Sequence, residues 1–239
     1  MTAPQPKREN LLLNLACNIA IPTIVLMKLS DENRLGPQWG MAVALLFPLA
    51  YGVYDLIQRK KTNLFSILGI ASVLLTGGLN QVKADGMWFA IKEASIPTLL
   101  GVAVLLSMRT KRPFVRELLW NDQVIDTAKV DAALAERGKQ PDFDRLLARA
   151  SYGLAFSFLV SAVLNFGLAR YLLKSPAGTP EFNAELGRMN LLNWPVIVIP
   201  SMAMTLYVLF SLIKGLTNLT GLQMEDIFHA PPEKPKAAK

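Results

Sequence analysis

The chain has 239 residues, of which 52% are hydrophobic and 18% are charged, and its net charge at pH 7 is +7. Soluble domains are about 45–50% apolar and about 25% charged. Only five of the 43 charged residues fall inside six long apolar windows, which indicates that the windows are membrane spans. This distribution argues against a soluble enzyme, a disulfide scaffold and a nucleic-acid-binding domain.

The six windows predict an all-α polytopic membrane protein, a bundle of six transmembrane helices. A helix needs about 20 apolar residues to cross a hydrocarbon core about 30 Å thick. The first window is the shortest, and Asn14, Asn18 and Pro22 lie inside it. In chain order the predicted spans are residues 11–27, 39–58, 64–82, 88–108, 151–173 and 192–214.

The distribution of basic residues predicts the orientation. Eighteen Lys and Arg residues lie on one side of the predicted bundle and six on the other, and cytoplasmic loops retain such residues during insertion. Both termini are therefore expected in the cytoplasm. The predicted organisation is a cytoplasmic N-terminus at 1–10, four spans within 11–108, a cytoplasmic loop with amphipathic helices at 109–150, two spans within 151–216 with an outer loop at 174–191, and a cytoplasmic tail at 217–239, disordered from about residue 230.

Aromatic and basic residues at the ends of the spans predict contacts with the lipid bilayer. Tryptophan prefers the headgroup boundary, and basic residues attract anionic lipid headgroups. The loop after the fourth span has apolar and basic residues bunched together, as in a helix lying in the inner interface; a solvated connector is the alternative. The outer loop is expected to hold one short surface helix within residues 182–189. The predicted lipid-interface residues are Trp39, Trp88 and Trp194 on the outer side and Arg109, Lys111, Arg112 and Arg116 on the inner side.

A short internal echo accompanies the predicted spans. Ile-Pro-Thr at residues 21–23 recurs at 96–98, and Ile-Pro-Ser follows at 199–201. If the first three spans correspond to the last three, the halves form an inverted 3+3 repeat, as in many secondary transporters. A chance match in Ile-rich helices is the alternative.

Prolines inside these spans suggest a pocket. Each proline frees a backbone carbonyl that must face protein or water, so kinked helices with nearby polar residues can line a cavity reached from outside. Packing kinks with interhelical hydrogen bonds are the alternative explanation. The candidate substrate-binding residues are Asn18, Pro22, Thr23, Lys92, Glu93, Pro97, Thr98, Arg170, Pro200 and Ser201.

Charged residues within the spans are costly and mark functional candidates. Lys92 and Glu93 are consecutive, so about 100° of helix rotation separates them, and we expect them on different faces. Arg170, at a similar predicted depth, is then the expected partner of Glu93. Interfacial snorkelling or a structural ion pair is the alternative to a substrate or proton site. Asp55 is expected to form a helix-surface pair with Arg59.

Residues for catalysis are scarce in this sequence. The single histidine, His229, follows the last predicted span, and Cys17 is the only cysteine, so no intramolecular disulfide can form. No zinc-helix or phosphate-loop motif occurs. We therefore expect no enzyme activity, no cofactor and no metal site.

One stretch of the chain resembles a known family. Thr62-Asn63-Leu64-Phe65, Gly77-Gly78, Trp88-Phe89, Lys92, Ile96-Pro97, Lys111-Arg112-Pro113-Phe114 and Leu118-Leu119-Trp120 resemble the intracellular septation protein A family. The whole chain is similar to a related family of bacterial six-span inner-membrane proteins, sometimes labelled as transporters, and shares Phe182-Asn183 and Thr220-Gly221-Leu222 with it. The resemblance implies the bacterial cytoplasmic (inner) membrane and a role in envelope maintenance and division. It also implies that Lys92 is a recurring in-span lysine.

Two functional hypotheses follow. The first is a non-enzymatic membrane protein that maintains the envelope through contacts with lipids, membrane-protein partners or its own copies, without nucleic acid. The alternative is a small secondary transporter with an outward-facing pocket at the proline-kinked helices. The first predicts a dry, packed core, whereas the second predicts water within the bundle.

Overall fold

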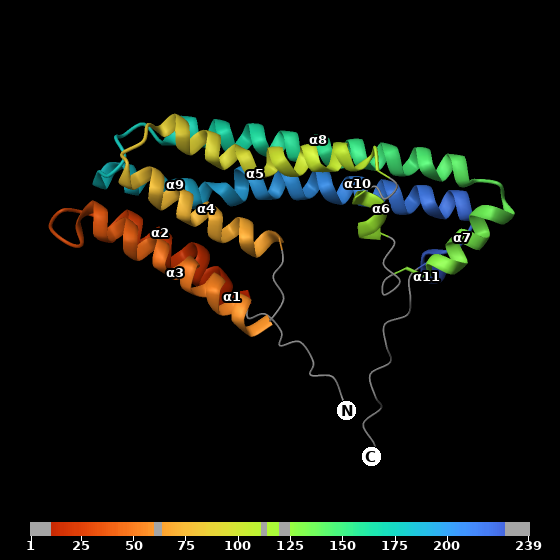
Figure 1. Cartoon of the computed structure of the whole chain (residues 1–239), viewed down its shortest axis with the longest axis horizontal. Helices are drawn as coiled ribbons and strands as arrows, with labels where there is room; N and C mark the ends of the chain where they lie inside the picture. Colours follow the sequence, from red (N-terminus) through yellow and green to blue (C-terminus); the bar gives the residue numbers. More distant parts are fainter. Residues whose placement is uncertain (1–10, 60–63, 111–113, 120–124, 228–239) are drawn as a thin grey trace, which may run out of the picture. The chain divides into compact units, whose positions relative to one another are not determined.

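The computed structural model describes residues 11–59, 64–110, 114–119 and 125–227 (Figure 1). Within these ranges every regular element is a helix and no strand occurs, which confirms the predicted all-α class. The predicted N-terminal segment 1–10, the interface residues Lys111 and Arg112, and the tail from residue 228, which includes His229, lie outside the described residues.

Four helices are long and apolar enough to cross a membrane, as expected for a membrane protein. They overlap the first, fourth, fifth and sixth predicted spans. The second and third predicted spans are occupied by helices α3 (Gly36–Arg59) and α4 (Leu64–Gln81), and a total of six crossings stays a prediction, as does the inverted repeat. The four candidate spans are Leu12–Leu29, Gly86–Ser107, Gln140–Leu172 and Pro180–Thr220, and the most apolar 18-residue window within each has a mean hydropathy of 1.8, 1.7, 1.7 and 2.3, respectively.

The first helix alternates between α-helical and π-helical turns, and Pro22 explains part of this pattern. Its segments are α1 (Leu11–Leu15), η1 (Ala16–Ala20), α2 (Ile21–Ile24) and η2 (Val25–Leu29). The Ile21 N–H donates to the Ala16 carbonyl, five residues earlier. Proline cannot donate a hydrogen bond, and its ring crowds the carbonyl four residues before it. The wider π-helical turn relieves this crowding, and such turns are frequent at functional sites.

Helices α5 (Gly86–Ser107) and α8 (Gln140–Leu172) are followed by a 41-residue helix that begins well before its predicted span. It comprises α9 (Pro180–Asn193), η3 (Trp194–Val198) and α10 (Ile199–Thr220). The Thr179 hydroxyl accepts a hydrogen bond from the Phe182 N–H at 3.2 Å, and Pro180 occupies the first helical position. This N-cap pattern starts the helix inside the predicted outer loop.

Tertiary contacts divide the chain into two compact units. Unit 1 comprises residues 1–96 and 161–199, and unit 2 comprises residues 97–160 and 200–239. Two of the boundaries coincide with Pro97 and Pro200, two of the prolines singled out in the sequence. The interior of each unit is described separately below.

The core of unit 1 contains two fully buried phenylalanine rings, Phe89 of α5 and Phe182 of α9, whose centroids lie 4.8 Å apart. Leu186 and Met189 are also buried, so one face of α9 belongs to the core. A Cβ on Gly187 would lie only 2.6 Å from the Cγ of Met27, so α9 packs closely against η2. The helix expected within residues 182–189 is present, but its expected surface position is wrong, because its apolar residues recur at helical spacing and are buried on one face.

The core of unit 2 joins the helices that lie between α5 and α8 to the last described helix of the chain. Helices α6 (Phe114–Leu119), α7 (Thr127–Glu136) and α11 (Met224–Ile227) belong to this unit. Ile227 is fully buried, and its carbonyl accepts a hydrogen bond from the Asp126 N–H at 2.9 Å. The first part of the predicted tail is thus folded, and its portion from residue 228 lies outside the described ranges. Other buried members of this core are Val130, Leu134, Phe143, Leu147, Leu212 and Leu216.

Candidate functional site

Unit 1 contains a cavity of about 500 Å³, lined by the first helix, α3, α4, α5 and α9. Four residues of its lining, Pro22, Pro48, Gly52 and Gly69, either interrupt helical hydrogen bonding or carry no side chain, which leaves space between helices. Polar groups within membrane helices are costly and mark functional sites by default. The polar lining residues are Asn14, Asn18, Tyr51, Asp55, Ser72, Thr76, Lys92, Glu93 and Asn190.

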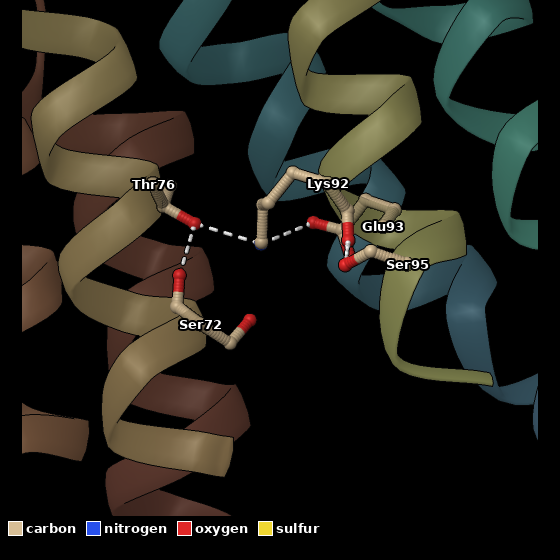
Figure 2. Close-up of polar contacts among 5 residues, drawn as sticks. All are labelled: Ser72, Thr76, Lys92, Glu93 and Ser95. Carbon is tan, nitrogen blue, oxygen red and sulfur yellow. Dashed lines mark hydrogen bonds and ion pairs between the residues drawn. The ribbon is translucent and has the colours of Figure 1, made fainter. Parts of the chain in front are cut away.

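Lys92 is one of the charged residues that line this cavity, and Figure 2 shows its polar contacts. Its ammonium group donates to Thr76 Oγ1 on α4 at 2.8 Å and lies 2.7 Å from Glu93 Oε1. Thr76 in turn donates to the Ser72 carbonyl at 3.0 Å. The side chains of Lys92 and Glu93 are 9% and 23% exposed. The ammonium group is therefore held by one carboxylate and one hydroxyl, with the carboxylate on the more open side.

The ion pair corrects the expectation that Lys92 and Glu93 lie on different faces. Their backbone positions are rotated by about 100°, but both side chains are long enough to turn toward each other across this angle. Glu93 pairs with its neighbour and not with Arg170, which lines a different pocket of unit 1. The structural ion pair, one of the alternatives for these residues, is therefore present.

The first helix contributes two amides to the cavity. Asn18 lies in the π-helical turn η1, and its Nδ2 donates to both the carbonyl and the Oδ1 of Asn14, each at 3.0 Å. Both residues line the cavity, together with Pro22. These amides add hydrogen-bond donors and acceptors to the cavity from the first helix, whereas the charged pair lies on α5. They belong to the predicted window that was the least typical of a membrane span.

The cavity brings together four of the ten predicted site residues: Asn18, Pro22, Lys92 and Glu93. Thr23 follows Pro22 in sequence and is buried, but it does not line the cavity, and its hydroxyl has no hydrogen-bond partner among the described residues. Its neighbour Pro22 faces the cavity because successive helix positions are rotated by about 100°. The remaining candidates, which do not line this cavity, are Pro97, Thr98, Arg170, Pro200 and Ser201.

Ser201 belongs instead to a polar contact between α8 and α10 in unit 2. Ser157 Oγ lies 3.3 Å from the Ser201 carbonyl and 3.1 Å from Thr205 Oγ1. Thr205 Oγ1 also donates to the Ser201 carbonyl, at 2.9 Å. These contacts are typical of hydrogen bonds between packed membrane helices, the alternative considered for the proline-associated polar residues.

Several cavity residues were missed by the sequence-based analysis. Asp55 lines the cavity, whereas it was expected to pair on a helix surface with Arg59, whose side chain lies outside the described residues. Its charge within a predicted span could have identified it. Thr76, Ser72 and Asn190 carried no comparable signal, because uncharged polar residues are common in membrane helices and only tertiary packing selects those that face a cavity.

The predicted outer-interface tryptophans all lie on the surface of unit 1. Trp39, Trp88 and Trp194 are 71%, 58% and 43% exposed. On the predicted inner side, Arg109 is exposed and Arg116 is half-buried. These side chains are available to lipid, and their position at the headgroup boundary stays a prediction.

The chemistry available in the cavity is hydrogen bonding and charge recognition. One ammonium group, two carboxylates and three amides can bind a solute that carries both donors and acceptors. Within the described residues, no group of three or more His, Cys, Asp or Glu side chains is placed to hold a metal ion. The arrangement therefore has the features of a binding site for a small polar molecule.

Comparisons with known proteins add no evidence to this interpretation, which rests on the geometry of the site. No family model matches the chain, and neither a curated protein nor a solved structure matches it. The resemblance to the septation protein A family and its six-span relatives stays a prediction.

Proposed function

We propose that this protein is a small, non-enzymatic carrier of the bacterial cytoplasmic membrane that binds a polar solute in the unit 1 cavity. The observation that carries the proposal is the cavity of about 500 Å³ around the Lys92–Glu93 pair, which lies on α5, a helix long and apolar enough to cross a membrane. A buried ion pair is a poor source of stability because desolvation offsets its attraction. Binding of a ligand explains the presence of this ion pair, whereas a contribution to stability does not.

The lining favours a small zwitterionic solute. Lys92 can attract a carboxylate, whereas Glu93 and Asp55 can attract an ammonium group. The amides of Asn14 and Asn18 can accept or donate further hydrogen bonds. An amino acid satisfies these requirements within the available volume. In this proposal six spans place both termini in the cytoplasm.

The alternative is a non-enzymatic envelope protein that acts through lateral contacts with lipids, other membrane proteins or its own copies. Large exposed apolar residues, among them Tyr171 and Tyr207, give it a surface for such contacts. Any membrane protein needs such a surface for lipid, so this feature does not distinguish the two functions. A polar cavity is an expectation of the carrier alone.

Cysteine labelling tests whether the cavity contains water. In a Cys17→Ser background, Asn18→Cys and Ser72→Cys should react with a membrane-impermeant maleimide in intact cells or inverted vesicles. Thr23→Cys, which is adjacent in the helix but 4% exposed and outside the lining, should not react. The exposed position Glu181→Cys serves as the positive control. Labelling at Glu181 in intact cells, with no labelling at either cavity position in intact cells or in inverted vesicles, would refute the carrier proposal.

Uptake measurements then test transport itself. Liposomes containing the purified full chain should accumulate at least one component of a radiolabelled amino-acid mixture, compared with empty liposomes. Lys92→Met should reduce this uptake at least fivefold, whereas Lys28→Met, a change at an exposed lysine outside the cavity, should not. Uptake equal to that of empty liposomes for the whole mixture would exclude amino acids as the substrate class.

A further inference from the structure

A second pocket of unit 1 has the opposite electrostatic character from the cavity. It has a volume of about 610 Å³ and lies where the α4–α5 turn meets the α8–α9 connection. Three cationic side chains line it, those of Lys83, Arg170 and Lys174, together with a single carboxylate, Asp85. A concave site with an excess of positive charge concentrates anions.

The acidic groups near this pocket are already occupied by other donors. Asp85 Oδ1 accepts the Met87 N–H at 2.7 Å and thereby caps the start of α5. Glu185 Oε2 accepts the Lys174 and Ser175 N–H groups at 2.9 and 3.0 Å, and its Oε1 accepts the Ser175 hydroxyl at 2.8 Å. Within the described part of the chain, neither Lys83 nor Arg170 forms an ion pair with these carboxylates. The positive charges of Lys83 and Arg170 are therefore available to bind an external anion.

The two connections that form the pocket are tied together. The Gly178 N–H donates to Asn80 Oδ1 at 3.0 Å, which joins the α8–α9 connection to the end of α4. Gly86 lies so close to the start of the α8–α9 connection that an added Cβ would be 2.6 Å from the Leu173 carbonyl oxygen. The cations are thus carried on backbone segments that are fixed relative to each other, as a binding site requires.

Aromatic residues at the same helix ends indicate the depth of the pocket in the membrane. Trp88, in the first turn of α5, and Tyr171, at the end of α8, are 58% and 72% exposed. Such residues prefer the headgroup region. The Lys174 ammonium group lies 5.4 Å from the centre of the Tyr171 ring. These residues favour a position of the basic pocket at the level of the lipid phosphates.

We propose that Lys83, Arg170 and Lys174 bind a phosphate group, that of an anionic phospholipid seated at this end of unit 1. The shared chemistry is recognition of a phosphate by guanidinium and ammonium groups. A free phosphate ion is the other source of the same chemistry. The site does not depend on the carrier proposal, because it uses none of the cavity residues.

Binding of a fluorescent phosphatidylglycerol to the purified full chain in neutral detergent micelles tests the site. Each removed cation should weaken binding about fivefold, so Arg170→Gln/Lys174→Gln should raise the Kd about 25-fold. The control double variant Lys28→Gln/Arg188→Gln removes the same charge from exposed positions outside the pocket and should change the Kd less than twofold. Phosphatidylcholine should compete poorly.

Two further arms complete the test. Displacement of the lipid by millimolar inorganic phosphate would assign the site to the free ion, and persistence of binding would assign it to the lipid. The charge-conserving variant Arg170→Lys/Lys174→Arg should bind within threefold of the parent, and the single variant Lys83→Gln should lose about fivefold if the double variant fails to fold. Equal affinities for the pocket and control variants, or equal binding of phosphatidylcholine, would overturn the proposal.

Discussion

Removing Glu93 while Lys92 remains is expected to destabilise unit 1 more than removing both charges. In Glu93→Gln the ammonium group loses its countercharge, because Glu93 is its only ion-pair partner among the described residues, and it keeps only neutral acceptors such as Thr76 Oγ1 at 2.8 Å. In Lys92→Met the remaining carboxylate lies on the more open side, at 23% exposure compared with 9% for the lysine. The two single variants should therefore differ, with Glu93→Gln the more destabilised.

The magnitude follows from the partial burial of the pair. Breaking a fully buried pair costs about 3–5 kcal/mol because it leaves an uncompensated charge. The pair borders the cavity, which lowers this cost. We expect the free energy of unfolding to fall by about 2 kcal/mol in Glu93→Gln and by about 1 kcal/mol in Lys92→Met. The double variant leaves no buried charge and should also lose about 1 kcal/mol. The coupling energy is then about 2 kcal/mol, within the range found for directly interacting residues.

Unfolding in mixed micelles by titration with sodium dodecyl sulfate measures the free energy of unfolding of the four proteins of this double-mutant cycle. The exposed residues Lys28 and Glu181 provide the control cycle Lys28→Met/Glu181→Gln, whose effects should add. Single-variant effects at Lys92 and Glu93 that add within about 0.5 kcal/mol would refute the reasoning, because additivity is the behaviour of independent sites.

Three further outcomes are expected. Gly86→Ala should destabilise the chain by about 1–3 kcal/mol because its Cβ would lie 2.6 Å from the carbonyl oxygen of Leu173, the residue after α8. Gly78→Ala, with no atom within 4 Å, should be neutral or stabilising, and the same unfolding titration compares the two variants. Phe182→Ala should lose about 3–5 kcal/mol, because it removes a fully buried ring, and a loss below 1 kcal/mol would contradict the assigned core. A hydrogen bond from Lys129, at 2.6 Å, and then the charge of Lys129 hold the pKa of Asp226 below its ordinary value of 3.8. The contact therefore stabilises the folded chain above pH 3.8, and this stabilisation is lost as the pH falls through the lower folded-state pKa. In Lys129→Met an NMR titration should show the pKa of Asp226 rising toward 3.8.

The long apolar helices, which are compatible with a membrane protein, followed from the sequence alone because they depend on local composition. In hydrocarbon every backbone polar group must be satisfied within its own helix, so a long apolar window is sufficient to predict a helix. Helix ends were less predictable from hydropathy. The cap at Thr179 and Pro180 starts a helix in a segment whose mean hydropathy is too low to indicate a span.

The candidate site was predictable in part. Lys92, Glu93 and Asn18 were recognisable because charged and amide side chains inside an apolar window are unusual and costly. Pro22 was recognisable because proline disrupts helical hydrogen bonding. The contact from Lys92 to Thr76 was not predictable, because the two residues lie on different helices and their distance depends on how α4 and α5 pack.

The sequence by itself determined that this protein consists of apolar helices carrying a few charges, because these properties belong to each segment separately. Only the tertiary structure decided which polar residues share a cavity, why α9 is buried, and how Arg170 comes to lie beside Lys83 and Lys174 and not beside Glu93. The physical reason is that a side chain's partner is set by the rotation and packing of neighbouring helices, and hydropathy contains little information about either.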